Sequence, residues 1–141
     1  MAATTVDRPI QMIGTPKSFE FNVAASTTIL KGELVALDSA ENLVSGTEAA
    51  SLEVVGIAAE HVDNSAGAAG DKTCQVYADA QFQLAATSIA QTAVGELMHL
   101  VDNQTIDETA GTNTVKVGFL VRVISSTSGW VFIPPFPARI A

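Results

Sequence analysis

Three side chains in the sequence have the chemistry for metal binding or nucleophilic catalysis: His61, His99 and Cys74. A metal site needs clustered ligands, and the two histidines are well separated in the sequence. Cys74 occupies one of the apolar positions of an alternating strand pattern, which is typical of a small buried hydrophobic group and not of a reactive thiolate. As the single cysteine it cannot form an internal disulfide. We therefore expect structural or surface imidazoles and an unreactive thiol.

Two segments are rich in possible oxygen ligands, residues 63–71 (DNSAGAAGD) and the run that contains Asp102, Asn103, Asp107 and Glu108. Neither has the ligand order and terminal Glu of a helical calcium loop, and turn chemistry explains both. The sequence also has no Gly-x-Ser-x-Gly, His-Glu-x-x-His, phosphate loop or dinucleotide fingerprint. We therefore expect no enzyme activity, no catalytic residue, no metal site and no cofactor.

The charge balance argues against further classes of protein. The 141 residues include 7 Lys and Arg against 15 Asp and Glu, a formal charge of -8. An acidic surface repels phosphate backbones and anionic lipid, so we expect neither nucleic acid nor a membrane as partner. No apolar run is long enough for a transmembrane helix, and the first residues do not resemble a signal peptide. Only 16% of the residues are charged, which indicates surface that is buried against other copies or a partner.

Strands must position these side chains, because apolar and polar residues alternate with a period of two along much of the sequence. In residues 72–84, every second residue from Cys74 to Leu84 is apolar. The same rule predicts one shared face for Val115, Val117, Phe119, Val121 and Val123, and another for Val55, Ile57 and Ala59. Further strands are predicted at 19–23, 33–37, 52–62, 96–101 and 130–133, and one short, weak helix at 87–94. Short strands between turn-rich segments predict an all-β fold, a small β-barrel or sandwich.

The strand pattern occurs twice. The tripeptide Gly32-Glu33-Leu34 recurs 63 residues later at Gly95, and the phenylalanine 13 residues before each glycine recurs as Phe19 and Phe82. The tripeptide Val55-Gly56-Ile57 recurs as Val117-Gly118-Phe119. Landmarks repeated in one order predict two copies of a β unit, about 19–81 and 82–136, within a single β domain of residues 19–141.

The first 18 residues show no alternation and contain Pro9 and Pro16, so they predict an extended N-terminal arm. This arm is more apolar than a solvated tail needs, and it either frays or becomes ordered on a partner. Its candidate contact residues are Val6, Pro9, Ile10, Met12 and Ile13. The other candidates for an intersubunit or docking edge are Trp130, Phe132, Pro134, Pro135 and Phe136, for which a core role is also open.

Three motifs follow one another along the first copy: Gly32-Glu33-Leu34-Val35, Val55–Ala58, and Ala69-Gly70-Asp71-Lys72-Thr73 leading to Phe82. In this order they resemble the small capsid decoration, or cement, proteins of tailed bacteriophages. The second copy departs from the pattern, because Ser125–Gly129 replaces the Gly-Asp turn. The resemblance covers roughly residues 19–123.

The resemblance implies a virion structural protein without catalytic activity. Such a protein binds the major capsid protein on the outer surface of an icosahedral head, commonly as a homotrimer, and stabilises the lattice against internal pressure. It would be made in the host cytoplasm. Two other classes stay open: a non-enzymatic β-sandwich binding module, for example for carbohydrate, and a small barrel enzyme. Exposed aromatic residues would favour the first, but the chain has one Trp and one Tyr.

Overall fold

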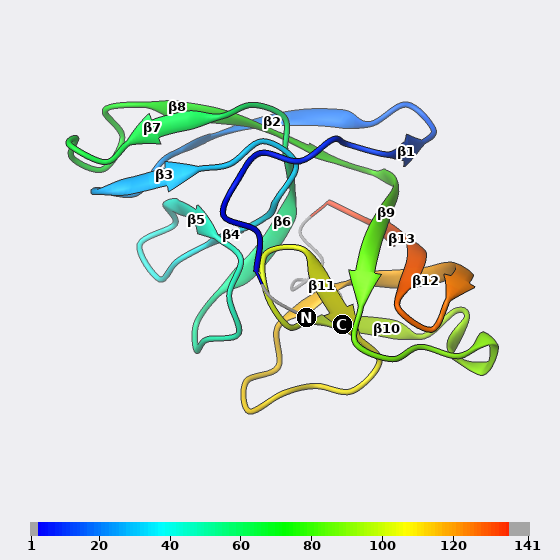
Figure 1. Ribbon diagram of the computed structural model, residues 1–141. Helices are drawn as coiled ribbons and strands as arrows, with labels where there is room; N and C mark the ends of the chain where they lie inside the picture. The colour runs from blue at the N-terminus through cyan, green and yellow to red at the C-terminus, as the bar shows by residue number, and fades with distance from the viewer. Residues whose placement is uncertain (1–2, 136–141) are drawn as a thin grey trace.

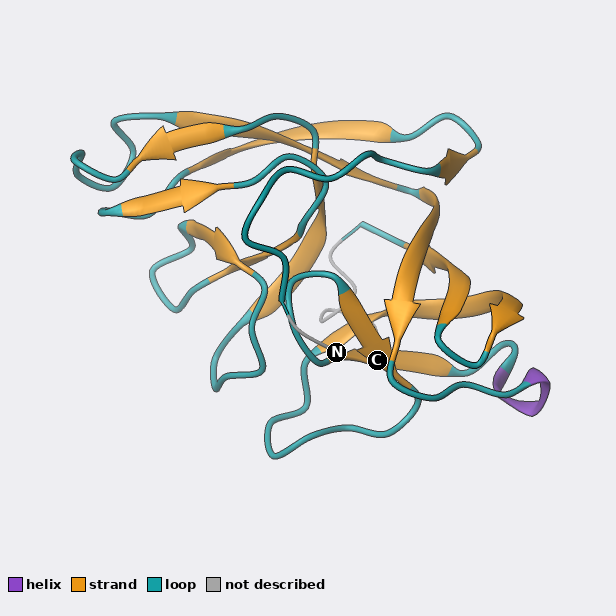
Figure 2. Cartoon of the chain, in the orientation of Figure 1, coloured by secondary structure: helices purple, strands orange, loops and turns teal. Residues whose placement is uncertain are grey.

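A five-stranded sheet and a six-stranded sheet form the body of the protein in a computed structural model that describes residues 3–135 (Figures 1 and 2). The first unit, in the upper left of Figure 1, contains in spatial order β2 (Lys17–Asn22), β8 (Thr73–Ala78), β6 (Glu53–Ala58), β4 (Leu34–Leu37) and β5 (Leu43–Ser45). The second unit contains β9 (Ala80–Ala86), β13 (Ser128–Ile133), β12 (Lys116–Ser125), β10 (Leu97–Leu100) and β11 (Thr105–Asp107). The sixth strand of this sheet is β1 (Met12–Ile13), which pairs with β9. The remaining elements are β3 (Thr27–Ile29), which pairs with β7 (Val62–Asn64), and the 3-10 turn Gln91–Ala93. The fold is all-β, as the alternation predicts.

The two units share one topology. The strands that correspond through the sequence repeat occupy the same places in the two sheets, from β2 and β9 at one side to β5 and β11 at the other. In the second unit β9 and β11 pair in parallel, which closes the sheet into a barrel. In the first unit a single parallel bridge, from Val23 to Leu43, joins the corresponding edges.

The repeated Gly-Glu-Leu tripeptide makes the same turn in both units. Gly32 and Gly95 have φ angles of 85° and 90°, in the left-handed region that glycine enters without strain. The Gly32 amide donates to Ala58 O at 2.9 Å, and the Gly95 amide donates to Leu120 O at 2.7 Å. The reciprocal bonds run from Ala58 N to Glu33 O and from Leu120 N to Glu96 O. The tripeptide therefore fixes the start of β4 and of β10 against the neighbouring strand.

The repeated Val-Gly pair is a β-bulge in each unit. Pairing of β4 with β6 shifts register at Val55, and pairing of β10 with β12 shifts at Val117. A Cβ on Gly56 would lie 2.2 Å from Tyr77 O, and a Cβ on Gly118 would lie 2.2 Å from Phe132 O, so each glycine admits the backbone of the next strand. The bulge also reverses the alternation. The prediction of one shared face for Val115, Val117, Phe119, Val121 and Val123, and of one for Val55, Ile57 and Ala59, is therefore wrong.

The long strand predicted at 72–84 is divided at Asp79. This residue has a φ of 63°, and its amide donates to Ile133 O at 2.7 Å. The chain turns there from β8 in the first unit to β9 in the second, as the green ribbon in Figure 1 shows. Buried residues still alternate on both sides of the turn, from Cys74 to Leu84. The two units thus share one continuous alternating segment.

Strand β4 is buried on both faces and lies between two hydrophobic clusters. Val35 and Leu37 belong to the cluster inside the first unit. Leu34 and Ala36 belong to the cluster that fills the second unit, together with Ile57 of β6. The outer face of the first unit therefore packs directly against the second unit. Within residues 3–135, no helix is long and apolar enough to cross a membrane.

Candidate functional site

The N-terminal arm lies along its own chain and contacts both units (Figure 1). Met12 and Ile13 form β1, which pairs with Phe82 and Gln81 of β9. Ile10 and Met12 pack against the hydrophobic cluster of the second unit. Val6 and Ile13 are 66% and 47% exposed, and Pro9 is also exposed. Of the candidate arm contacts, these three are accessible to a partner, while Ile10 and Met12 help to hold the arm in place.

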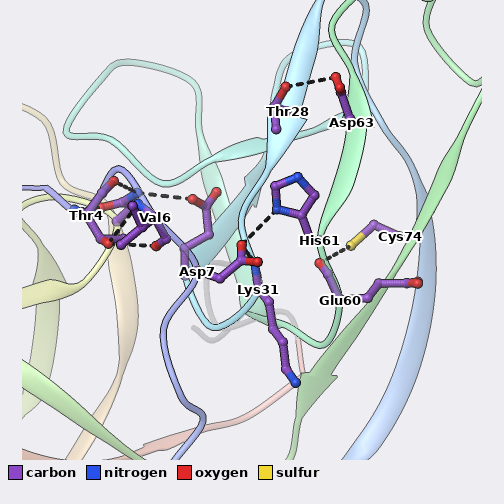
Figure 3. A network of polar contacts seen from close by, with 11 residues as sticks. Thr4, Val6, Asp7, Thr28, Lys31, Glu60, His61, Asp63 and Cys74 are labelled. Atoms are coloured by element: carbon purple, nitrogen blue, oxygen red, sulfur yellow. Dashed lines mark hydrogen bonds and ion pairs between the residues drawn. The ribbon is translucent and has the colours of Figure 1, made fainter.

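Asp7 tethers the arm to the first unit, as Figure 3 shows. Its Oδ1 accepts from the Lys31 amide at 2.9 Å and lies 2.8 Å from Nδ1 of His61. The next residue, Arg8, donates its amide to Lys31 O at 2.9 Å. The hydrogen bond from His61, and then that from the Lys31 amide, lowers the pKa of Asp7. The role of His61 in this structure is thus to hold the arm.

Asn103 joins the arm to both units. Its Oδ1 accepts from the Thr4 amide at 2.8 Å, and its Nδ2 donates to Thr4 O at 3.0 Å. The same Nδ2 donates to Oε2 of Glu33 at 3.1 Å, and the Asn103 carbonyl accepts from the Leu34 amide at 2.7 Å. One side chain in the turn between β10 and β11 therefore anchors both the arm and the Gly-Glu turn. The sequence suggested only a turn residue here, because a long-range polar contact leaves no local pattern.

Glu33 is fully buried, whereas most buried side chains in this protein are apolar. Burial raises the pKa of Glu33, because the charged form loses its hydration. Hydrogen bonds from Ser45 and Asn103 oppose this rise. The other carboxyl oxygen, Oε1, is buried without a hydrogen-bond partner. A carboxyl group that is partly satisfied thus lies where the arm and the two units meet.

The C-terminal candidates divide between the core and the outer side of β13. Trp130 and Phe132 are half-buried and alternate with the buried Val131 and Ile133. Trp130 pairs with Arg122, and Phe132 pairs with Phe119, both on β12. Pro134 and Pro135 follow the strand and are half-buried, while Phe136 lies outside the described residues. Trp130 and Phe132 therefore belong to an outward-facing row and not to the barrel interior.

The oxygen-rich segment 63–71 is a hydrogen-bonded turn. Oδ1 of Asp63 accepts from the Ser65 amide at 3.0 Å and from Oγ1 of Thr28 at 3.2 Å. Hydrogen bonds, chiefly those from Ser65, lower the pKa of Asp63 to about 2. Nζ of Lys72 donates to Asp63 O at 2.6 Å, so a cation of the chain itself already lies at this turn. In the part of the chain that is described, no three His, Cys, Asp or Glu side chains are grouped to hold a metal ion.

Cys74 lies in the interior of the first unit, fully buried. Burial, and next the charge of Glu60, raises the pKa of the thiol to about 12. A thiol with such a pKa is protonated at neutral pH and is a poor nucleophile. It packs with Val35, Val55 and Val76, so Cys74 acts as a small core residue.

No protein-family model matches the chain, and no curated protein matches it either.

Proposed function

We propose that this chain is a virion structural protein that binds the outer surface of an icosahedral phage head and stabilises the capsid lattice. One observation carries the proposal. The three motifs that resemble decoration proteins supply β4, β6 and β8, which are neighbours in the sheet of the first unit. The resemblance thus rests on adjacent strands of one sheet and not on scattered peptides.

The surface properties support the same function. With a formal charge of -8, the chain has no electrostatic attraction for packaged DNA. Val6 and Ile13 expose apolar side chains on an arm that is itself held by both units. An apolar residue on an ordered backbone loses little conformational entropy on binding, so it suits a permanent contact with the major capsid protein.

The proposed mechanism is stabilisation by mass action. A protein that binds only the intact lattice stabilises it by RT ln(1 + [L]/Kd), about 2.7 kcal/mol per site when its concentration is a hundredfold above Kd. The same gain at every site of the lattice slows rupture under internal pressure. This mechanism needs contact surfaces and no reaction, and the family resemblance supports a homotrimer on the virion exterior.

Co-sedimentation with purified phage heads that lack the protein tests the proposal. We expect saturable binding and heads that rupture at a higher temperature. Changing Val6 and Ile13 together to Asp should weaken binding about tenfold or more, because a charge would be buried at the contact. Ile124→Asp is the matched control, since Ile124 is 48% exposed and Ile13 is 47% exposed.

Two results would overturn the proposal. The first is a folded protein that ignores heads at every stage of assembly. The second is saturable binding to a glycan in place of the head, which would favour the carbohydrate-binding alternative.

A further inference from the structure

The same row of residues crosses both units on their outer faces. In the first unit Leu34 pairs with Ile57, and Ile57 pairs with Tyr77. In the second unit the corresponding row is Leu97, Phe119 and Phe132, with the same pairings. Both rows therefore consist of large apolar or aromatic side chains at equivalent positions.

In the first unit this row is covered. Leu34 is 0% exposed and Ile57 is 2% exposed, and both belong to the hydrophobic cluster of the second unit. Tyr77 packs against the same cluster. The contact between the two units within one chain thus uses this outer face.

In the second unit the equivalent row is not covered. All four residues of β4 are buried, whereas β10 alternates between half-buried and buried residues. Leu97, Phe119 and Phe132 are each half-buried. The row continues through Gln81 to the exposed Ile13, because Phe132 pairs with Gln81 and Ile13 pairs with Gln81 from the other side. A mostly apolar row therefore spans five strands and faces solvent in a single chain.

Basic residues outnumber acidic ones on this face, whereas acidic residues are in excess in the protein as a whole. Strands β9, β10, β12 and β13 contain no Asp or Glu, although the chain has 15, and the one acidic residue in the strands of this sheet is Asp107 on β11, which pairs with His99. Lys116 and Arg122 lie on β12, and His99 pairs with Lys116. We call Leu97, His99, Lys116, Phe119, Arg122, Trp130 and Phe132 the second outer face. Two such faces would repel each other, whereas an acidic surface would complement one.

We propose that the second outer face binds a second copy of this chain, through an acidic surface of that copy. Two observations identify a copy as the occupant: the equivalent face of the first unit is already covered by this chain, and the chain with a formal charge of -8 supplies the complementary charge. The contact is heterologous, because one face meets a different surface of the next copy, and such contacts form a ring where the rotation between copies closes. The proposal rests on the self-association included in the proposed function and not on capsid binding.

Sedimentation of the full chain over a range of concentrations tests the proposal. We expect the wild type to associate, and Phe119→Ser to raise the dissociation constant about 30-fold, as for a central aromatic contact. Phe19→Ser is the control, because Phe19 is also a half-buried phenylalanine but lies on β2 of the first unit, and it should leave association unchanged. Changing Lys116 and Arg122 together to Glu tests the same contact without removing an aromatic residue, and it should weaken association by a comparable factor.

A mixing experiment tests whether the contact is heterologous. The Phe119→Ser chain keeps its acidic surface, so it should still bind the intact second outer face of the wild type. In excess it should therefore convert larger assemblies into dimers of one wild-type chain and one variant chain. Failure of the variant to bind the wild type would instead indicate a face-to-face contact and overturn the proposal.

Two further outcomes would also overturn the proposal. One is a wild type that stays monomeric at all concentrations. The other is a Phe119→Ser chain that associates normally but loses binding to heads, which would assign the face to the capsid. If heads are not bound at all and the Phe119→Ser effect remains, the self-association stands and only the capsid proposal fails.

Discussion

The two units of this protein have the same strand order, the same glycine turn and the same bulge, yet equivalent residues lie in opposite surroundings. Glu33 is fully buried, whereas Glu96, at the same point of the same turn, is exposed. Leu34 is buried under the second unit, whereas Leu97 is half-buried. The repeated pattern therefore fixes the backbone of each unit, and what packs against the unit determines the environment of its outer face.

The largest expected effect comes from the bulge glycines. Gly56→Ala and Gly118→Ala should each cost about 3 kcal/mol of unfolding free energy or more, because each new Cβ would lie 2.2 Å from a neighbouring carbonyl oxygen. Chemical denaturation of the two variants measures the cost. If one variant is as stable as the wild type, the bulges are not equivalent and the two units do not share their strand geometry.

The turn glycines should separate the two units. At Gly95 a Cβ meets nothing within 4 Å, so Gly95→Ala should cost about 1 kcal/mol for the left-handed backbone alone. At Gly32 it would lie 2.3 Å from Arg8 O, so Gly32→Ala should cost about 2–3 kcal/mol and displace the arm. Denaturation and amide exchange at Arg8 measure both effects. Equal costs for the two variants would contradict the close contact between Gly32 and Arg8 of the arm.

The two glutamates should differ in their pH dependence. The folded pKa of Glu33 is raised above its ordinary 4.5, so its contribution to stability is complete below that value and is lost as pH rises through the folded pKa. Each unit by which the pKa is raised corresponds to about 1.4 kcal/mol. Glu33→Gln should remove this loss of stability at rising pH. The measurement is the free energy of unfolding of the variant and of the wild type as a function of pH. Glu96→Gln is the control, and an identical change in both variants would be inconsistent with burial of Glu33 alone.

The smallest expected effect is at the exposed tether of the arm. The folded pKa of Asp7 is lowered, so the stability that it contributes is present above its unfolded pKa and is lost as pH falls through the folded pKa. Asp7→Asn should therefore speed amide exchange at Lys31, whose N–H donates to Asp7. Global stability should change little. Exchange that is unaffected by this variant would show that the other contacts of the arm, those of Asn103, Arg8 and β1, hold it without Asp7.

Much of the fold could be predicted from sequence because alternation and repeated turns are local patterns. The strands of three residues, β3, β5, β7 and β11, could not be, since a run of three is too short to show a period. The division at Asp79 also had no signal, because buried residues continue to alternate through it. The bulges at Val55 and Val117 reversed the predicted faces, although Gly56 and Gly118 were recognised as part of the repeat.

The candidate contact surface was less predictable. Trp130 and Phe132 could be named as aromatic residues near a chain end, but their neighbours Phe119 and Leu97 come from other strands and need the register to be known. Comparing the two copies would have given one signal. Leu97, Phe119 and Phe132 keep the bulk of Leu34, Ile57 and Tyr77, while His99 and Lys116 replace Ala36 and Val54. Such a mixture of retained apolar and new basic residues indicates a face that is buried only on association.

Quenching of Trp130 fluorescence by acrylamide tests the role of this face most directly, because Trp130 is the single tryptophan and lies beside Phe132 and Arg122 on the second outer face. If that face binds another copy, quenching falls as protein concentration rises, with the same midpoint as the increase in mass. If mass increases while quenching stays constant, the chains associate through another surface and the assignment of this face is wrong.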